Sequence, residues 1–180
     1  ILIPKIILHE FEGDYSYVPN NNNFNRLLDM VIDQGNGPIS VKKLLYKSII
    51  LPRLIDTRGL ENLPNSICLF GPPGTGKTTL ASNIAKVLGW SFIRIEPSAF
   101  VKDGIDKFDQ RVVFVFDCLK HLEKTVILFD EMDEYIKKRT VETNDESKSS
   151  SPDFFNRLST NIFLTEIDKL YKYNKNVIYL

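Results

Sequence analysis

Glycine, lysine and threonine recur at a fixed spacing in the stretch "GPPGTGKT", residues 71 to 78. Gly71, Gly76, Lys77 and Thr78 satisfy the pattern G-x-x-x-x-G-K-[ST]. Backbone N–H groups can turn inward around phosphate oxygens only where glycine allows a positive φ or spares a clash with Cβ. The lysine adds a mobile positive charge for the β and γ phosphates, and the threonine hydroxyl is a ligand for Mg²⁺. The predicted chemistry is therefore the binding of nucleotide phosphates together with Mg²⁺.

The residues predicted to hold the nucleotide form this loop and continue into the next helix. They are Gly71, Pro72, Pro73, Gly74, Thr75, Gly76, Lys77, Thr78 and Thr79. Lys77 is also a predicted catalytic residue, and Thr78 is a predicted metal ligand. The alternative is a glycine-rich turn that binds no ligand. A complete match to the motif, located between an apolar run and a predicted helix, disfavours this alternative.

A second candidate site follows the apolar run "TVILF" at 125 to 129. Nucleotide turnover needs an acidic group that holds the water shell of the metal and a base that orients the attacking water. Asp130 would lie at the end of a strand near Mg²⁺, and Glu131 would act as the general base. The alternative is that these carboxylates only favour a helix N-terminus, which is the role predicted for Asp133 and Glu134.

Strand-like and helix-like segments alternate from residue 66 to residue 180. The predicted strands are 66–70, 91–96, 125–129 and 176–180, and the predicted helices are 77–88, 106–123 and about 153–171. This order is typical of a parallel sheet with helices on both faces, in which ligands bind at the carboxyl ends of the strands. The glycine-rich loop follows such an end.

The sequence outside this alternation is less regular. Apolar residues at helical spacing predict a helix over 41–55 that ends or kinks at Pro52. The polar stretch 140–152 is predicted to be a loop. Residues 1–40 form a separate N-terminal segment for which no structure or chemistry is predicted, and 41–180 form the core that binds nucleotide.

The composition is that of an ordinary globular protein. The 23 Lys and Arg residues balance 23 Asp and Glu residues, so no overall basic charge indicates a nucleic-acid partner. No apolar run reaches the roughly 18 to 20 residues of a membrane-spanning helix. Cys68 and Cys118 lie in apolar stretches, which predicts buried free thiols in a reducing compartment, with the cytoplasm as the default. The ends of the chain, Ile1 and Leu180, are expected to be those of an excerpt.

Other features are expected to be structural. Apolar residues at helical spacing predict one packed helix face, made of Phe108, Val112, Val115, Phe116 and Leu119. The basic run 137–139 is expected to be a solvated face. His9 and His121 lack a second ligand at a spacing typical of metal sites, so no zinc site is predicted.

Two motifs together resemble the AAA+ ATPases. The stretch "GPPGTGKTTLA" is similar to the phosphate loop of the AAA subgroup, and "ILFDEMDEYIKKR" is similar to its second acidic motif, with Arg139 as the basic residue that follows. The resemblance covers about residues 41–180. It implies an α/β fold of the P-loop NTPase class, a three-layer sandwich with a parallel sheet, that binds ATP and Mg²⁺. It also implies a homo-oligomeric ring, usually a hexamer, that couples hydrolysis to remodelling of a macromolecular substrate.

The family pattern also places residues beyond this sequence. The resemblance implies that the sensor 1 residue would follow Leu180, so we expect the core to be truncated before it, with the arginine finger and the helical lid domain absent from this sequence. The excerpt alone is expected to be weakly active or inactive. In the substrate-gripping loop of the family an aromatic-apolar pair precedes a glycine, whereas Lys102 and Asp103 precede Gly104 here. Phe100 is either a substitute for that aromatic residue or a core side chain, and its residue type favours the core.

Three other functions fit the sequence less well. A P-loop kinase would need an arginine-bearing lid, for which the sequence offers no candidate. A GTPase would need the motif N-K-x-D, and "NKNV" at 174–177 lacks the aspartate. A nucleotide-gated assembly scaffold would bind ATP with little turnover, and the presence of Glu131 counts against it.

Overall fold

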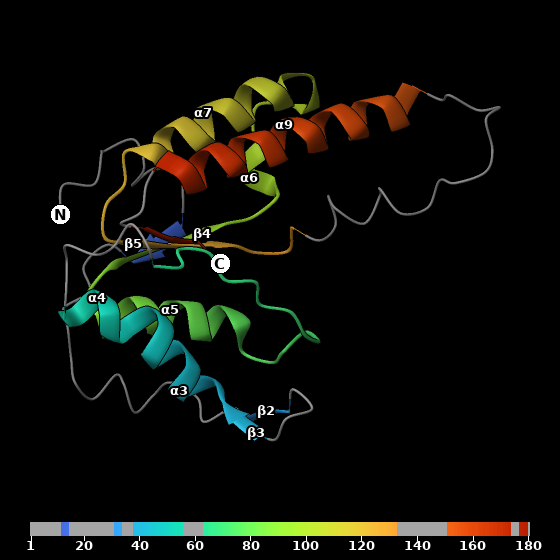
Figure 1. Ribbon diagram of the computed structural model, residues 1–180. Helices are drawn as coiled ribbons and strands as arrows, with labels where there is room; N and C mark the ends of the chain where they lie inside the picture. Colours follow the sequence, from blue (N-terminus) through green and yellow to red (C-terminus); the bar gives the residue numbers. More distant parts are fainter. Residues whose placement is uncertain are drawn as a thin grey trace.

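The computed structural model describes residues 12–14, 31–33, 38–55, 63–132, 151–173 and 177–179. The strands are β1 (Glu12–Asp14), β2 (Val31–Asp33), β3 (Pro38–Ser40), β4 (Ser91–Ile95), β5 (Thr125–Phe129) and β6 (Val177–Tyr179). The helices are α3 (Val41–Leu45), the π-helix η1 (Tyr46–Ile50), α4 (Leu51–Ile55), α5 (Lys77–Leu88), α6 (Ser98–Val101), the 3₁₀-helix η3 (Ile105–Lys107), α7 (Phe108–Lys120) and α9 (Ser151–Tyr173). These elements form three layers, with a sheet between two sets of helices (Figure 1).

The central sheet has the strand order β1-β4-β5-β6. β4, β5 and β6 run parallel, and β1 pairs antiparallel with β4 at the edge. The middle strand β5 is almost continuously apolar and buried, as expected for a parallel strand covered on both faces. β2 and β3 form a separate antiparallel pair. The strands predicted at 91–96, 125–129 and 176–180 are therefore confirmed, and so is the α/β fold with a parallel sheet.

The apolar run 66–70 differs from its prediction, because it forms a single bridge to the sheet instead of a strand. Ser66 pairs in parallel with Tyr179 of β6. The Tyr179 N–H donates to the Asn65 carbonyl at 2.7 Å, and the Ile67 N–H donates to the Tyr179 carbonyl at 2.8 Å. Within the described residues, this bridge is the pairing recorded for the run. The run nevertheless lies at the open edge of β6 and leads into the glycine-rich loop.

Tyr179 is the buried anchor of this edge. Its side chain is 1% exposed, and its hydroxyl donates to the Leu170 carbonyl of α9 at 3.5 Å. Its ring packs against Tyr171, with 5.1 Å between the ring centroids. Burial raises the pKa of the Tyr179 phenol well above its ordinary value. The neutral phenol therefore ties the last described strand to α9.

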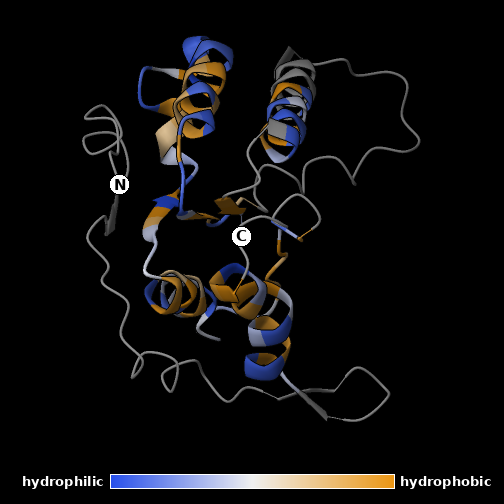
Figure 2. Cartoon of the chain, turned by 60° about the vertical axis from the view of Figure 1, so that its left-hand side comes forward, coloured by the Kyte–Doolittle hydropathy of each residue, from blue (hydrophilic) through white to orange (hydrophobic). Residues whose placement is uncertain are grey.

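Helices cover both faces of the sheet and enclose two cores. α3, η1, α4 and α5 lie on one side, and α6, α7 and α9 lie on the other (Figure 1). On the first side Ile84 of α5 belongs to one core with Val126 and Ile178. On the second side Phe116 of α7 belongs to the other core with Ile127. Figure 2 shows hydrophobic stretches of these helices facing the sheet. The predicted three-layer sandwich is confirmed.

Glycine defines both ends of α5, the helix that follows the loop. Gly76 precedes it in the left-handed region, with φ 81°, and its carbonyl accepts the first helical hydrogen bond from the Leu80 N–H at 2.8 Å. Gly89 ends it with φ 67°, and the following Trp90 N–H donates back to the Ala85 carbonyl at 2.9 Å. This is the hydrogen-bond pattern of a glycine-terminated helix. The helix predicted over 77–88 is therefore confirmed at both ends.

The helical segment 41–55 does not end at Pro52. It continues from α3 through the π-helix η1 into α4, which contains the proline. The Leu51 N–H donates to the Tyr46 carbonyl, five residues earlier, instead of the usual four. Proline has no N–H and its ring clashes with the carbonyl four residues before it. A wider turn immediately before the proline relieves that clash, so the irregularity precedes Pro52 while the helix persists.

Aromatic side chains fill the core under α7 and α9. Phe100 is 1% exposed and packs edge-on against Phe163, with 5.3 Å between the ring centroids. It is a core residue, as its residue type predicted. The five apolar residues predicted to share one face of α7 are all buried. The helix itself begins at Phe108 rather than at 106, because residues Ile105–Lys107 form a 3₁₀ turn after Gly104, whose φ is 101°.

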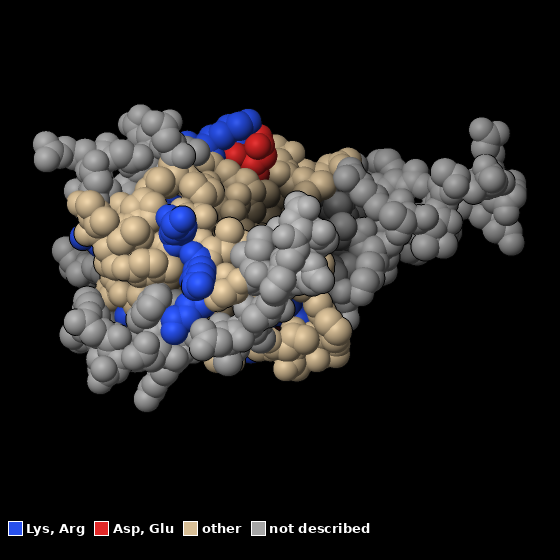
Figure 3. Space-filling view, turned by 60° about the horizontal axis from the view of Figure 1, so that its bottom comes forward, with Lys and Arg blue, Asp and Glu red and all other residues tan. Residues whose placement is uncertain are grey.

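The cysteine prediction is partly wrong. Both thiols are free, but Cys68 is exposed and Cys118 is half-buried. Cys68 lies two residues after Ser66, whose bridge to Tyr179 is the sheet pairing recorded for this run among the described residues. The described helices include none that is long and apolar enough to cross a membrane. Viewed from the side of α3 and α5, basic side chains form a short row on a surface that is otherwise largely uncharged in its described part (Figure 3).

Several residues discussed above lie outside the described residues. They are His9, Asp133, Glu134, Lys137, Lys138 and Arg139. The loop predicted over 140–152 is described only from 151, where α9 has already begun.

Candidate functional site

The glycine-rich loop lies between the edge segment 66–70 and α5. Its glycines adopt conformations that other residues rarely reach, with φ of 150° at Gly71, 78° at Gly74 and 81° at Gly76. The Thr75 hydroxyl donates to the Pro72 carbonyl at 2.9 Å and closes the turn from within. Residues 71–75, which include Pro73, are all exposed. The loop is thus a shaped turn that is open to solvent at the start of a helix.

Lys77 folds back over this loop. Its Nζ donates to the carbonyls of Gly71 and Pro72, each at 3.0 Å. The ammonium group therefore lies within the turn, at the N-terminus of α5, where the helix dipole also carries positive partial charge. The charge of the Lys77 ammonium and the positive end of the α5 dipole therefore coincide, and together they favour binding of an anion. Thr79 is exposed on the first turn of α5, and its carbonyl accepts from the Ser82 hydroxyl.

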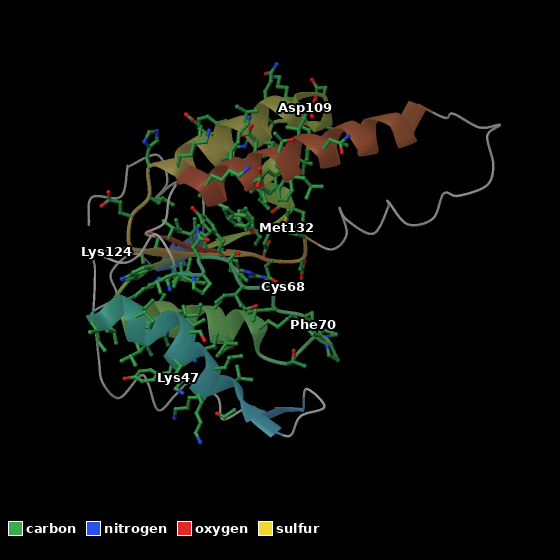
Figure 4. The ribbon with its side chains drawn as sticks, in the orientation of Figure 1. Lys47, Cys68, Phe70, Asp109, Lys124 and Met132 are labelled. Atoms are coloured by element: carbon green, nitrogen blue, oxygen red, sulfur yellow. The ribbon has the colours of Figure 1, made fainter. Side chains whose placement is uncertain are left out.

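Asp130 lies directly after β5, at the carboxyl end predicted for it. Its N–H donates to the Ile95 carbonyl at 2.9 Å, so the parallel register of β4 and β5 continues through this residue. The Thr78 hydroxyl donates to Asp130 Oδ2 at 3.1 Å. The structure therefore brings the end of the loop and the end of β5 into direct contact. In Figure 4, Met132 lies above the sheet, toward α7 and α9, whereas Cys68 and Phe70 lie below it, on the side of α5.

Glu131 has an unusual backbone. Its φ is 58°, in the left-handed region that costs a non-glycine residue roughly 1–2 kcal/mol. Its side chain is exposed, and its N–H donates to Asp130 Oδ1 at 3.2 Å. Among the described residues, no hydrogen bond or ion pair joins Glu131 to the loop, whereas Asp130 accepts a hydrogen bond from Thr78. Strained backbone next to a carboxylate cluster is a frequent feature of functional sites.

Arg94 is a site residue that the sequence analysis missed. Its Nε donates to Asp130 Oδ2 at 2.9 Å, and its second terminal nitrogen lies 2.7 Å from Glu96 Oε1. The sequence did carry a signal, because an arginine interrupts the apolar strand "SFIRI" one residue before its end. Charged residues are rarely placed in a buried strand unless they are paired. Arg94 therefore belongs to the same cluster as Thr78 and Asp130.

The oxygen donors of this cluster are of the type that Mg²⁺ prefers. They are a threonine hydroxyl and a carboxylate, on two different elements. Among the described residues no group of three or more His, Cys, Asp and Glu side chains is placed to hold a metal ion. A separate cavity of about 370 Å³ is lined by Asp103, Lys107, Gln110, Arg111 and Phe114, and none of these belongs to the loop.

Sequence comparisons match this part of the chain to known proteins. The family model described as "ATPase family associated with various cellular activities (AAA)" matches residues 67–179. The proteasome-activating nucleotidase of Methanothermobacter thermautotrophicus is 36% identical over 99 residues, covering 55% of this chain and 24% of that protein. Spastin of Dictyostelium discoideum is 30% identical over 150 residues, covering 81% of this chain and 23% of that protein. The chain spans about a quarter of the length of these curated relatives.

Solved structures share the fold. The structure titled "Crystal structure of FIGL-1 AAA domain in complex with ADP" aligns with a TM-score of 0.61 and 20% identity, covering 97% of this chain and 51% of that one. The structure titled "Structural Basis for Katanin Self-Assembly" aligns with a TM-score of 0.53 and 21% identity, covering 100% of this chain and 51% of that one. The family model matches more than half of the chain and includes both the loop and Asp130. The chain therefore belongs to the AAA family of ATPases.

Proposed function

We propose that this chain is the ATP-binding core of an AAA ATPase that binds and hydrolyses Mg-ATP. In the complete protein, hydrolysis would be coupled to remodelling of a macromolecular substrate. One observation carries the proposal: the Thr78 hydroxyl at the end of the loop lies 3.1 Å from the Asp130 carboxylate at the end of β5. A loop that only held phosphate would not need this second, acidic element beside it.

The described residues fit Mg-ATP. The positive φ values of Gly71, Gly74 and Gly76 give the loop the turned backbone that a phosphate cradle requires. The Lys77 ammonium already lies inside that turn, on two carbonyl oxygens. Phosphate oxygens are stronger acceptors for an ammonium group than carbonyls, so Lys77 would exchange partners on binding. The remaining loop residues Pro72, Pro73, Thr75 and Thr79 would line the same cradle.

Two oxygen donors would hold the metal. Thr78 would coordinate Mg²⁺ through Oγ1, and Asp130 would hold the metal directly or through its water shell. When bound, Mg²⁺ neutralises charge on the phosphate oxygens and orients them. Lys77 would neutralise charge on the same phosphates and is therefore assigned to catalysis as well as to binding.

Glu131 would be the general base. Glu131 is exposed and directly follows Asp130, and its carboxylate would accept a proton from the attacking water. In the described conformation its backbone is left-handed and its N–H is bonded to Asp130. A change at this strained peptide would redirect the carboxylate, so we propose that Glu131 reaches its working position only when nucleotide is bound.

Ring assembly is part of the proposal for the complete protein. Family membership and the self-assembly named for the katanin structure support a homo-oligomer, with a hexamer as the expected form. ATPase rate per subunit should then rise with protein concentration, because a neighbouring subunit completes each site. A rate per subunit that is independent of concentration, over a range that spans assembly, would argue against the ring.

The test uses two substitutions in the complete protein, Lys77→Ala and Glu131→Gln, with Lys172→Ala on α9 as the control. Lys77→Ala should weaken ATP binding by more than about tenfold, measured by fluorescence of an ATP analogue. Glu131→Gln should keep ATP affinity within a few fold but slow phosphate release by about 10²- to 10⁴-fold. Lys172 pairs only with Asp168 in the described contacts and is solvent-exposed, so its loss should change neither quantity.

Each outcome separates one function from another. Unchanged ATP affinity in Lys77→Ala would overturn the phosphate-loop assignment. Unchanged turnover in Glu131→Gln would overturn the base assignment. Tight ATP binding with negligible turnover in the unsubstituted protein, at concentrations where it is assembled, would favour a nucleotide-gated scaffold over an ATP hydrolase.

A further inference from the structure

We infer that Arg94 is a built-in cation that holds Asp130 before the metal binds and competes with Mg²⁺ for its carboxylate. Arg94 would thereby set the Mg²⁺ concentration at which the site takes up Mg-ATP. This inference rests on the proposed function, because it assumes that Mg²⁺ reaches Asp130 together with ATP. It assigns a positioning role to a residue outside the glycine-rich loop and the acidic pair.

The strand pattern places Arg94 on the side of the sheet that α5 covers. Side chains alternate along a strand, so Phe92 and Arg94 share one face, while Ile93 and Ile95 share the other. Phe92 belongs to the core beneath α5, and Ile93 belongs to the core beneath α7. Arg94 therefore points toward the helical layer that contains α5, whose first turn includes Thr78.

The register of the neighbouring strand brings Asp130 to the same place. Arg94 stands opposite Leu128 in the parallel pairing of β4 and β5, and Leu128 belongs to the core beneath α5. Asp130 lies two residues beyond Leu128, and its N–H continues the ladder to Ile95. It therefore faces the same side as Arg94, one step toward the carboxyl end. The salt bridge is a consequence of this register.

The contacts occupy the Asp130 carboxylate on both oxygens. Oδ2 accepts from Arg94 Nε at 2.9 Å and from the Thr78 hydroxyl at 3.1 Å, while Oδ1 accepts from the Glu131 N–H at 3.2 Å. A metal ion that approaches Oδ2 meets a guanidinium already bonded to that atom. Binding of the metal would require Arg94 to release it, or at least to share it.

Glu96 is an alternative ion-pair partner for the Arg94 guanidinium. The Arg94 terminal nitrogen already lies 2.7 Å from Glu96 Oε1, and both side chains are about one-third exposed. The Asp130 side chain is more sheltered, at 15% exposed. If Mg²⁺ displaces Arg94 from Asp130, the ion pair with Glu96 can keep the displaced charge neutralised. One arginine thus lies between two carboxylates, and the sheltered one is the proposed metal ligand.

The size of the effect follows from the exposure of the pair. Partly exposed ion pairs contribute little net stability, because water competes for both charges. Removing Arg94 should therefore lower the Mg²⁺ concentration for half-maximal ATP binding by a moderate factor, about three- to tenfold. A charge-retaining lysine lacks the Nε–H that contacts Asp130, so Arg94→Lys should shift the midpoint in the same direction but by less.

The experiment is a Mg²⁺ titration of ATP binding in the complete protein. A fluorescent ATP analogue is held at fixed concentration, and Mg²⁺ is raised from an EDTA-treated start. Arg94→Gln should have a lower midpoint than the unsubstituted protein, and Glu96→Gln a higher one, because a guanidinium freed from Glu96 holds Asp130 more strongly. Lys172→Gln, which removes a charge on α9, should leave the midpoint unchanged. The opposite shifts of Arg94→Gln and Glu96→Gln would not follow from a general loss of stability.

The outcomes distinguish this inference from the function it rests on. If the unsubstituted protein binds no ATP analogue at any Mg²⁺ concentration, the proposed function fails. If it binds, but Arg94→Gln has an equal or higher midpoint, the competition between Arg94 and Mg²⁺ is refuted while the proposed function stands. If Arg94→Gln does not fold, Glu96→Gln still tests the competition between Arg94 and Mg²⁺. An unchanged or lower Mg²⁺ midpoint in Glu96→Gln would refute that competition.

Discussion

Thr78 and Asp130 are 52 positions apart in the chain, yet the hydroxyl of one donates to the carboxylate of the other at 3.1 Å. Neither residue is placed by its own neighbours alone. Thr78 is positioned by the first turn of α5, which follows Gly76. Asp130 is positioned by the hydrogen bonds between β4 and β5. Their contact forms only when α5 packs against β5, so it depends on correct packing of this helix on the sheet.

Removal of the Thr78 hydroxyl should weaken Mg²⁺-dependent binding. Thr78→Val keeps the shape of the side chain and loses the oxygen, so ATP affinity in Mg²⁺ should fall by about tenfold or more, while affinity in EDTA changes little. Isothermal titration calorimetry in both buffers measures this. Thr165→Val on α9 is the matched control, because among the described residues the Thr165 hydroxyl donates to the Asn161 carbonyl and is remote from the loop. Equal losses with and without Mg²⁺ would argue against a metal-ligand role.

Phe100 and Ile105 should respond very differently to truncation. Phe100 is 1% exposed among aromatic rings, so Phe100→Ala should lower the free energy of unfolding by about 3–5 kcal/mol. Ile105 is 80% exposed, so Ile105→Ala should change it by no more than about 0.5 kcal/mol. Urea denaturation followed by circular dichroism measures both. A small effect at Phe100 would contradict its assignment to the core.

Lys124 is a position where glycine should stabilise the protein. It precedes β5 with φ 48°, and its carbonyl accepts from the Ser91 N–H at 3.0 Å (Figure 4). Lys124→Gly should relieve the left-handed strain and raise the unfolding free energy by about 0.5–1 kcal/mol. Lys107, with φ −104°, is the control, and Lys107→Gly should lower stability by a similar amount. The prediction fails if both substitutions destabilise the protein equally.

Stability should fall in strongly alkaline solution, partly because of Tyr179. Burial raises its pKa above the ordinary value of 10.0, so above that pH the unfolded chain loses the phenolic proton while the folded chain keeps it. The folded state then binds more protons, and the unfolding free energy declines by about 1.4 kcal/mol per pH unit from this group. Below pH 10 the contribution is fully present.

The comparison of Tyr179→Phe with the unsubstituted protein isolates this effect. The substitution removes the ionisable group but keeps the ring beside Tyr171. Urea denaturation from pH 8 to pH 11 should therefore give a shallower decline for Tyr179→Phe than for the unsubstituted protein. Parallel declines would show that the Tyr179 phenol does not contribute.

The sequence predicted those parts of the fold that depend on local pattern. β5 is recognisable because it is a short, continuously apolar run, and α5 because glycine stands at each end. The loop and Asp130 were found for a related reason, since their chemistry needs particular residue types at particular positions. Local pattern could not show that Ser66 pairs with Tyr179, because that contact joins two segments more than 100 residues apart.

Arg94 could not be assigned because its partner is set by strand register. From the sequence it is one arginine in an apolar strand, and its contact with Asp130 exists only once β4 and β5 are aligned. The same reasoning explains the error at Cys68. Apolar neighbours in sequence predict burial, but exposure depends on whether another strand covers the sheet edge. In both cases the missing information was a contact between distant segments.

The exposed thiol of Cys68 gives the site a chemical handle. It lies three residues before the first glycine of the loop, whereas Cys118 is a half-buried residue of α7 that packs against the core. A thiol-specific dye should therefore react first at Cys68, and its emission would respond to changes in the loop nearby. Single-molecule recordings from such a labelled protein could follow nucleotide arrival and departure in real time, without any substitution in the residues that bind it.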